Sequence, residues 1–234
     1  SVSPNSKFAI HSYSNFNTPK ITQLISLPDH KSIRYLVKNE RLKEKVEKLN
    51  IKDGEFFRIT TENGIQLDGW RILPPDFNPN KKYPVLFYVY SEPGSQTVLD
   101  NFSSFNLWHQ MLAQKGYIVM SIDSRGTPAP RGREWRKCVH KKIGIIAVED
   151  QANAVKRITE KWDYVDPERI AIWGWSGGGS MTLNMMFRHP ELYNTGMSVA
   201  PVSNQLYYDT IYQERYMGLP SDNLDNYKKG SPIT

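Results

Sequence analysis

Short apolar runs alternate with longer segments of helical periodicity through most of this chain, from about residue 55 onward. The apolar runs predict buried strands at 84–90, 117–123, 169–173 and 196–200, and the segments between and after them predict helices at 102–115, 145–162 and 180–187. We expect Gly116 to end the first of these helices. Strands that alternate with helices predict a mainly parallel sheet with helices on both faces, so the expected fold class is α/β.

An antiparallel hairpin is expected at the start of this sheet. Two strand-like runs, at 55–60 and 65–73, flank Glu62-Asn63-Gly64, and an Asn-Gly pair favours a tight hairpin turn.

The first thirty residues follow a different pattern. Strand-like runs at 8–13 and 21–26 flank a turn-like segment at 15–19, and residues 38–49 mix Lys and Arg with Glu, as a solvated connecting helix does. Two strands alone cannot bury a core. We therefore expect this segment to be the edge of a larger β structure or to pack on the main domain.

The most informative motif is Gly174-Trp175-Ser176-Gly177-Gly178, a Gly-x-Ser-x-Gly pattern between a predicted strand and a predicted helix. A strand, a tight turn and a helix form a nucleophile elbow, which exposes the serine hydroxyl above the sheet. The N–H of Gly177 then lies at a helix N-terminus, where it can stabilise an oxyanion. A plain glycine-rich turn is the alternative. The hairpin followed by a later elbow is the order of the α/β-hydrolase fold.

A serine nucleophile needs a base, usually a histidine held by a carboxylate, and in this fold both follow the serine along the chain. His189 is the only histidine after Ser176, at the end of the helix that leads away from the hydroxyl. We interpret His189 as a helix-end residue and expect the catalytic Asp and His to lie beyond Thr234. The chain alone is then expected to be catalytically inert.

Composition narrows the possible partners and chemistry. The net charge is +6, but the densest run of charges, from Lys38 to Lys48, alternates in sign, so we expect no nucleic-acid binding. No stretch approaches the roughly 18 apolar residues of a membrane-spanning helix. Cys138 is the only cysteine, and we interpret it as a bystander thiol rather than a reactive one.

Ser176 lies within Ile172-Trp173-Gly174-Trp175-Ser176-x-Gly178-Gly179, and other ordered segments accompany it: Val89–Gln96, Asp123–Gly126, Val148–Gln151, Val199–Ser203, Tyr207–Asp209 and Tyr212–Pro220. Together they resemble the dipeptidyl peptidase IV branch of the prolyl oligopeptidase family, over about residues 50–234. The resemblance implies an α/β-hydrolase catalytic domain at 36–234, incomplete at its C-terminus. Residues 1–35 would be the end of a β-propeller and its connector.

The resemblance also assigns roles that make chemical sense. Ser176 would attack the scissile carbonyl, and Tyr90 would donate its phenol O–H to the oxyanion beside the Gly177 N–H. Three further residues would form the pocket for the residue before the cleaved bond: Val202, Tyr208 and Tyr212. Flat aromatic walls suit a compact proline ring, although ordinary core packing is the alternative for these tyrosines.

Three positions depart from what is usual in the branch. Gly177 stands where a tyrosine is usual, Ser180 where an aromatic residue is common, and Gln205 where tryptophan is frequent. We expect hydrolysis to survive these changes and one side of the pocket to be more polar or more open. They put a strict preference for proline in doubt.

The leading hypothesis is a serine exopeptidase that releases N-terminal dipeptides with proline or alanine at the second position, using no metal or cofactor. The alternatives are a related serine hydrolase, such as an oligopeptidase or acylaminoacyl peptidase, and a non-catalytic binding protein on the same scaffold. By the resemblance, the partners would be peptide substrates and a second copy in the full-length protein. The expected location is outside the cytoplasm, in the periplasm or at the cell surface.

Overall fold

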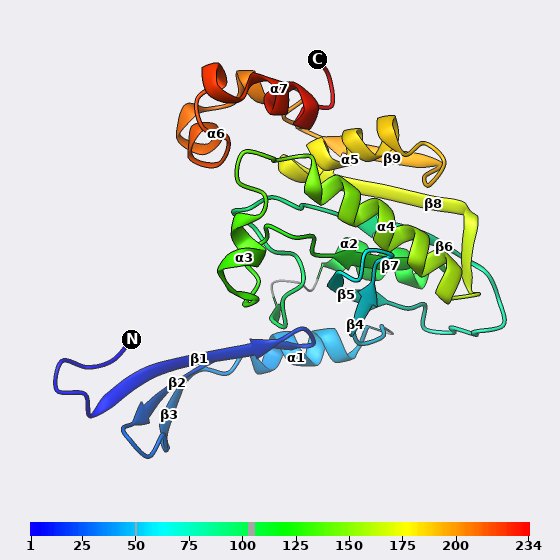
Figure 1. Cartoon of the computed structure of the whole chain (residues 1–234). Helices are drawn as coiled ribbons and strands as arrows, with labels where there is room; N and C mark the ends of the chain where they lie inside the picture. The colour runs from blue at the N-terminus through cyan, green and yellow to red at the C-terminus, as the bar shows by residue number, and fades with distance from the viewer. Residues whose placement is uncertain (50, 103–105) are drawn as a thin grey trace.

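The computed structural model describes residues 1–49, 51–102 and 106–234, which form two sheets and their flanking helices (Figure 1). The N-terminal sheet contains β1 (Phe8–Asn15), β2 (Thr18–Ser26) and β3 (Ser32–Val37), paired antiparallel in chain order. It projects from one side of the body, and the last two helices lie on the opposite side (Figure 1).

The main sheet has six strands in the order β4-β5-β7-β6-β8-β9. These are β4 (Glu55–Thr60), β5 (Gln66–Ile72), β6 (Tyr83–Tyr88), β7 (Ile118–Ile122), β8 (Val165–Trp175) and β9 (Thr195–Val199). The β4–β5 and β5–β7 pairs are antiparallel, and the pairs that join β7, β6, β8 and β9 are parallel. The predicted hairpin and mainly parallel sheet are therefore confirmed.

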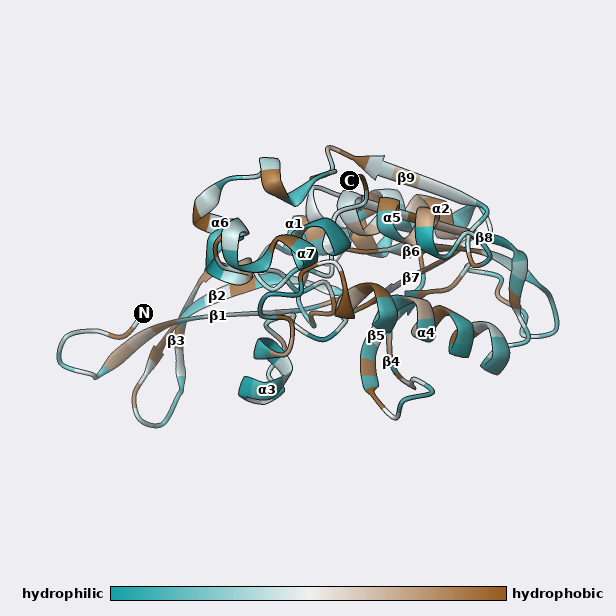
Figure 2. Ribbon diagram, turned by 45° about the horizontal axis from the view of Figure 1, so that its top comes forward, coloured by the Kyte–Doolittle hydropathy of each residue, from teal (hydrophilic) through white to brown (hydrophobic). Residues whose placement is uncertain are grey.

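Helices cover both faces of this sheet, as the sequence predicted. The helices are α1 (Glu40–Glu47), α2 (Leu107–Gln114), α3 (Gly132–Lys137), α4 (Ile146–Lys161), α5 (Gly177–Arg188), α6 (Thr210–Met217) and α7 (Pro220–Gly230). Along β7, Met120 packs with α4 and α5 in the larger core cluster, whereas Val119 packs with Ala113 of α2 in a second cluster. Successive side chains of a strand point to opposite faces, so β7 is buried throughout. The central strands are accordingly apolar, and α3 is hydrophilic (Figure 2).

The N-terminal sheet packs on the main domain through the tip of its first hairpin. The Phe16 side chain is buried there, with its ring centroid 5.6 Å from that of Trp70 on β5. The Phe16 N–H donates to Asp100 Oδ1 at 2.8 Å, and the Gly54 N–H donates to Asn17 Oδ1 at 3.2 Å. The sequence left two arrangements open for the first thirty residues, the edge of a larger β structure or packing on the main domain. The structure shows packing on the main domain.

Most predicted elements agree with the structure to within a few residues. The helix predicted at 102–115 begins at Leu107, where Asn106 caps it, and residues 103–105 of that prediction lie outside the described residues. Five elements were missed: β3, α3, α6, α7 and a short 3-10 helix at Gln205–Tyr207. β3 is exposed along its whole length, and the missed helices bury few residues, so none has a strong apolar period.

We predict that Phe16→Ala lowers the free energy of unfolding by about 3 kcal/mol, since it removes a buried ring and leaves a cavity beside Trp70. Thermal unfolding of the protein would measure the loss. Tyr13→Ala is the matched control, because Tyr13 lies on the same hairpin and is 41% exposed. Equal effects of the two substitutions would show that the hairpin tip contributes no special packing.

Candidate active site

Ser176 lies at a sharp turn between β8 and α5. Its backbone has φ 56° and ψ −117°, a positive φ that is uncommon for a residue with a side chain. The turn is held by two backbone hydrogen bonds, from the Ser176 N–H to Val199 O at 2.9 Å and from the Ser180 N–H to Ser176 O at 3.0 Å. The strand, turn and helix that a nucleophile elbow requires are all present, and α5 starts directly after the serine.

The glycines around Ser176 are required by close contacts between backbones. A Cβ atom at Gly178 would lie 2.1 Å from the carbonyl oxygen of Val89, the residue that follows β6. A Cβ atom at Gly174 would lie 2.4 Å from the carbonyl carbon of Gly178. Side chains at these positions would therefore separate α5 from the sheet and displace the serine.

A small cavity of about 50 Å³ opens beside Ser176. The residues that line it are Tyr90, Glu92, Ile143, Ser176, Gly177, Ser180, Val202, Gln205, Tyr208, Tyr212 and Gln213. All six residues singled out from the sequence are among them, although they come from three separate parts of the chain. The fold brings together the loop after β6, the start of α5 and the segment from β9 to α6.

Tyrosines from the segment around α6 form one wall of this cavity. The rings of Tyr208 and Tyr212 meet edge to face with centroids 5.7 Å apart, and Tyr212 packs similarly on Tyr216 at 4.9 Å. Tyr207 is 87% exposed and is not part of the wall. Asp209 caps α6 by accepting a hydrogen bond from the Tyr212 N–H at 2.8 Å, which fixes where the tyrosines point.

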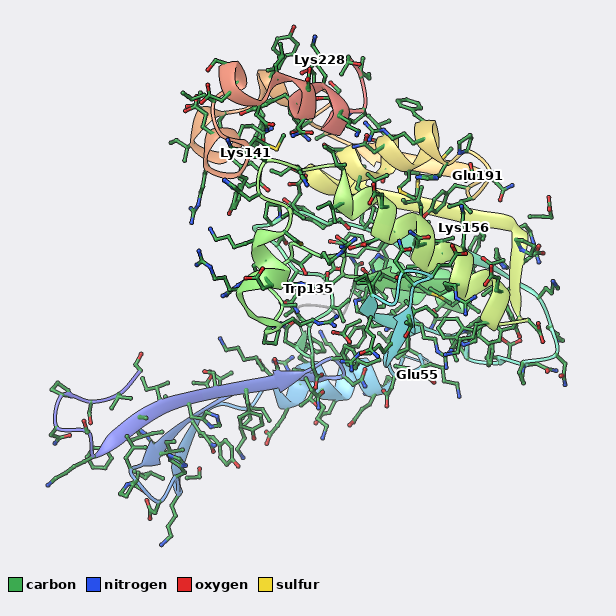
Figure 3. All side chains as sticks on the ribbon, in the orientation of Figure 1. Glu55, Trp135, Lys141, Lys156, Glu191 and Lys228 are labelled. Atoms are coloured by element: carbon green, nitrogen blue, oxygen red, sulfur yellow. The ribbon has the colours of Figure 1, made fainter. Side chains whose placement is uncertain are left out.

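Gln205 has a structural role at the cavity that was not predicted from the sequence. Its side chain is buried, and Nε2 donates to Ile143 O at 3.3 Å and Gly230 O at 3.1 Å. The amide therefore joins the loop before α4 to α7. Lys141, on the same loop, donates its N–H to Tyr216 O at 2.7 Å and lies beside α6 (Figure 3).

Sequence reasoning missed three residues that line the cavity, Ile143, Gln213 and Glu92, and of these only Glu92 is ionisable. Its Oε2 accepts a hydrogen bond from the Tyr212 hydroxyl at 2.8 Å. Burial raises the pKa of Glu92 to about 7, against the opposing effect of this hydrogen bond. Burial, and then the charge of Glu92, raise the pKa of Tyr212, which keeps its phenol protonated as the donor. The sequence signal was a glutamate two residues after Tyr90.

The loop that carries Tyr90 and Glu92 is anchored by two buried polar side chains. Gln151 Nε2 donates to Ser91 Oγ at 2.9 Å, and Ser91 has a positive φ of 60°. Further along, Asp123 accepts hydrogen bonds from the N–H groups of Thr97 at 2.9 Å and Val98 at 3.1 Å. Burial nevertheless raises the pKa of Asp123 to about 6. The hydrogen bonds of Gln151 and Asp123 therefore fix the conformation of the loop.

The described histidines do not supply a base to Ser176, since none lines the cavity. His189 follows the last residue of α5, and its Nδ1 lies 3.4 Å from Glu191 Oε1. A helix of 12 residues spans about 18 Å, so His189 is far from the serine at the helix start. His109 is buried in contact with Trp173, and burial lowers its pKa to about 4.

The part of the chain that the structure describes gives little support to thiol chemistry or to metal binding. The Cys138 thiol donates to Trp135 O, and burial raises its pKa, which disfavours the reactive thiolate. The described residues contain no group of three or more His, Cys, Asp or Glu side chains able to hold a metal ion. None of the described helices has the length and apolar character needed to cross a membrane.

We predict that Glu92 makes stability depend on pH. Between about pH 4.5 and 7 the carboxyl ionises in the unfolded chain but stays protonated in the folded protein, so the free energy of unfolding falls as pH rises. Above pH 7 the carboxyl is ionised in both the folded and the unfolded protein, and the loss levels off at about 3 kcal/mol. Glu92→Gln does not titrate, so its melting temperature relative to the unsubstituted protein should rise across this window. A difference that is independent of pH would contradict the raised pKa.

Comparison with known proteins agrees with this geometry. The model of the prolyl oligopeptidase family matches residues 103–234. The chain is 39% identical to a probable dipeptidyl-aminopeptidase B of Metarhizium robertsii over 230 residues, which cover 97% of this chain and 25% of that protein. It is 37% identical to a probable dipeptidyl peptidase 4 of Emericella nidulans, with 97% of this chain and 29% of that protein covered.

The fold is also that of a solved relative. The crystal structure of Porphyromonas gingivalis dipeptidyl peptidase 4 matches with a TM-score of 0.93 and 40% sequence identity, over 98% of this chain and 32% of that one. The α/β-hydrolase fold expected from the sequence is thereby confirmed. The chain spans about a quarter to a third of the length of the relatives it matches. It belongs to the prolyl oligopeptidase family.

Proposed function

We propose that the protein containing this chain is a serine exopeptidase that removes dipeptides from the N-termini of peptides through an acyl-enzyme on Ser176. One observation carries the proposal: a serine with strained backbone, a tyrosine, a free helix N-terminus and an aromatic wall meet at one small cavity. The names of the relatives, dipeptidyl peptidases and dipeptidyl-aminopeptidases, support the same activity.

The reaction would begin with attack of Ser176 Oγ on the scissile carbonyl. The negative charge that develops on the carbonyl oxygen would be stabilised by the Tyr90 hydroxyl and by the Gly177 N–H at the start of α5. Val202, Tyr208 and Tyr212 would surround the side chain of the residue before the cleaved bond. We assign the general base and its carboxylate partner to parts of the protein outside this chain.

Residues 1–35 are proposed to be the end of a β-propeller and its connector. Apolar side chains on the N-terminal sheet are 42–49% exposed in this chain, among them Phe8, Ile10, Ile33, Tyr35 and Val37. Exposed apolar residues on a three-stranded sheet are typical of a surface that neighbouring strands cover. The β3 strand continues to Val37, two residues past the proposed boundary.

We predict that the full-length protein releases p-nitroaniline from Gly-Pro-p-nitroanilide and that a fluorophosphonate probe labels it. Ser176→Ala should abolish both signals, because each requires the serine oxygen as nucleophile. Ser180→Ala is the control for labelling, since the Ser180 hydroxyl is bonded to Val202 O at 2.9 Å. Labelling that survives Ser176→Ala would remove this serine from the mechanism.

We predict that Tyr90→Phe in the full-length protein lowers kcat by roughly 100-fold, the scale of losing one oxyanion donor, with a smaller effect on KM. Steady-state kinetics on the best dipeptide substrate would measure it. Tyr207→Phe is the matched control, because Tyr207 is 87% exposed and should leave kcat unchanged. A Tyr90→Phe enzyme of normal turnover would exclude the phenol as an oxyanion donor.

A further inference from the structure

Glu92 and Gly177 are sterically coupled across the active-site cavity. A Cβ atom at Gly177 would lie 2.3 Å from Glu92 Cγ and 3.1 Å from both Cδ and Oε1. Such distances are too short for any side chain at 177 while Glu92 keeps its position. The missing side chain at 177 therefore leaves the space in which a carboxyl group becomes part of the cavity wall.

One oxygen of the Glu92 carboxyl accepts a hydrogen bond within the protein, and no described residue bonds to the other. Oε2 accepts the Tyr212 hydroxyl at 2.8 Å, whereas no described residue donates to Oε1 and no described cation forms a salt bridge with Glu92. Filling the cavity with an apolar side chain would remove water from Oε1 without replacing its hydrogen bond, which is unfavourable.

Three other polar side chains of the cavity, those of Ser180, Gln205 and Gln213, are already hydrogen-bonded within the protein. The Ser180 hydroxyl donates to Val202 O and accepts from the Val202 N–H, both at 2.9 Å. Both hydrogen bonds of the Gln205 amide nitrogen go to backbone carbonyls, and Gln205 Oε1 accepts from Gln213 Nε2 at 3.3 Å. Glu92 Oε1 thus offers an uncommitted acceptor next to Gly177, and the hydroxyl of Tyr208, which is 41% exposed, is likewise not bonded to a described residue.

The size of the cavity restricts which substrate side chains can reach Glu92. The cavity of about 50 Å³ has room for only a few water molecules, which favours a short side chain over the long chains of lysine and arginine. Among short side chains, a hydroxyl group suits a carboxyl in either protonation state, because a hydroxyl both donates and accepts. Burial raises the pKa of Glu92 to about 7, so both states are populated near neutral pH.

We propose that Glu92 is a specificity-determining residue that selects substrates with a short, hydroxyl-bearing residue (serine, threonine or hydroxyproline) before the cleaved bond. The hydroxyl would hydrogen-bond to Glu92 Oε1 between the Tyr212 ring and Gly177. This inference rests on the proposed function, which makes the cavity the pocket for that residue. It deepens the proposed function by replacing a purely apolar preference with a polar one.

The test compares substrates that differ by a single hydroxyl. The full-length protein would be assayed on Gly-Ser-, Gly-Ala-, Gly-hydroxyprolyl- and Gly-Pro-7-amido-4-methylcoumarin. We expect kcat/KM to be about tenfold higher for serine than for alanine and for hydroxyproline than for proline, the scale of one buried hydrogen bond. These ratios need no variant, and a purely structural role of Glu92 would not produce them.

Variants then assign the preference to Glu92. Glu92→Leu, which removes the acceptor, should bring both ratios to about one or below, and Glu92→Gln, which keeps an oxygen acceptor, should retain much of the preference. Glu191→Leu is the matched control, because Glu191 lies in the loop beyond the far end of α5 (Figure 3) and should leave the ratios unchanged.

The possible failures are distinguishable. Ratios near one in the unsubstituted protein, or ratios that Glu92→Leu leaves unchanged, would overturn the role of Glu92 while the dipeptidyl-peptidase activity stands. If a fluorophosphonate labels Ser176 but none of the four dipeptide substrates is cleaved, the proposed function fails and the inference fails with it.

Discussion

The close approach of α5 to the ends of β6 and β8 is the constraint on which the site depends. The Gly178 backbone lies so near Val89 O that a methyl group would not fit between them. This contact places the start of α5, and with it Ser176, directly beside the loop that follows β6. Tyr90 and Glu92 reach the serine because that loop leaves the sheet at the same edge. In a parallel sheet the carboxyl ends of adjacent strands meet at one edge, which is where such sites form.

The remaining wall of the cavity is held by hydrogen bonds as well as by apolar packing on the small cluster of Ile143, Met217 and Tyr227. The segment from Gln205 to Tyr216 is held by a capping aspartate, by the Gln205 amide and by the backbone of Lys141. Few of its side chains are buried. The position of the tyrosines therefore depends on directional contacts to a loop and a helix that are distant in the sequence. A polar scaffold of this kind fixes orientation well but has no sequence periodicity that reveals it.

The sequence was most informative where burial imposes a pattern. The strands of the main sheet, α4 and the turn at Ser176 were predicted because apolar runs and glycines mark them directly. It was least informative for α6 and α7, which bury only two residues each and so show no clear apolar period. Glu92 was overlooked for a different reason: its place in the wall depends on the missing side chain at Gly177, far along the chain. The resemblance showed that glycine is unusual at position 177, but only the structure shows that Glu92 fills the space beside it.

The buried Phe16 has a consequence for how the chain tolerates changes in length. Hairpin tips are usually the positions where insertions do least harm, since their backbone is exposed. In the N-terminal sheet, by contrast, the tip at Asn15–Thr18 joins the sheet to the main domain. The Phe16 ring packs against Trp70, and the Phe16 N–H donates to Asp100. The opposite end, around Asp29 and His30, is exposed. Among related chains, variation in loop length should therefore accumulate at that outer turn, while the inner turn keeps a constant length.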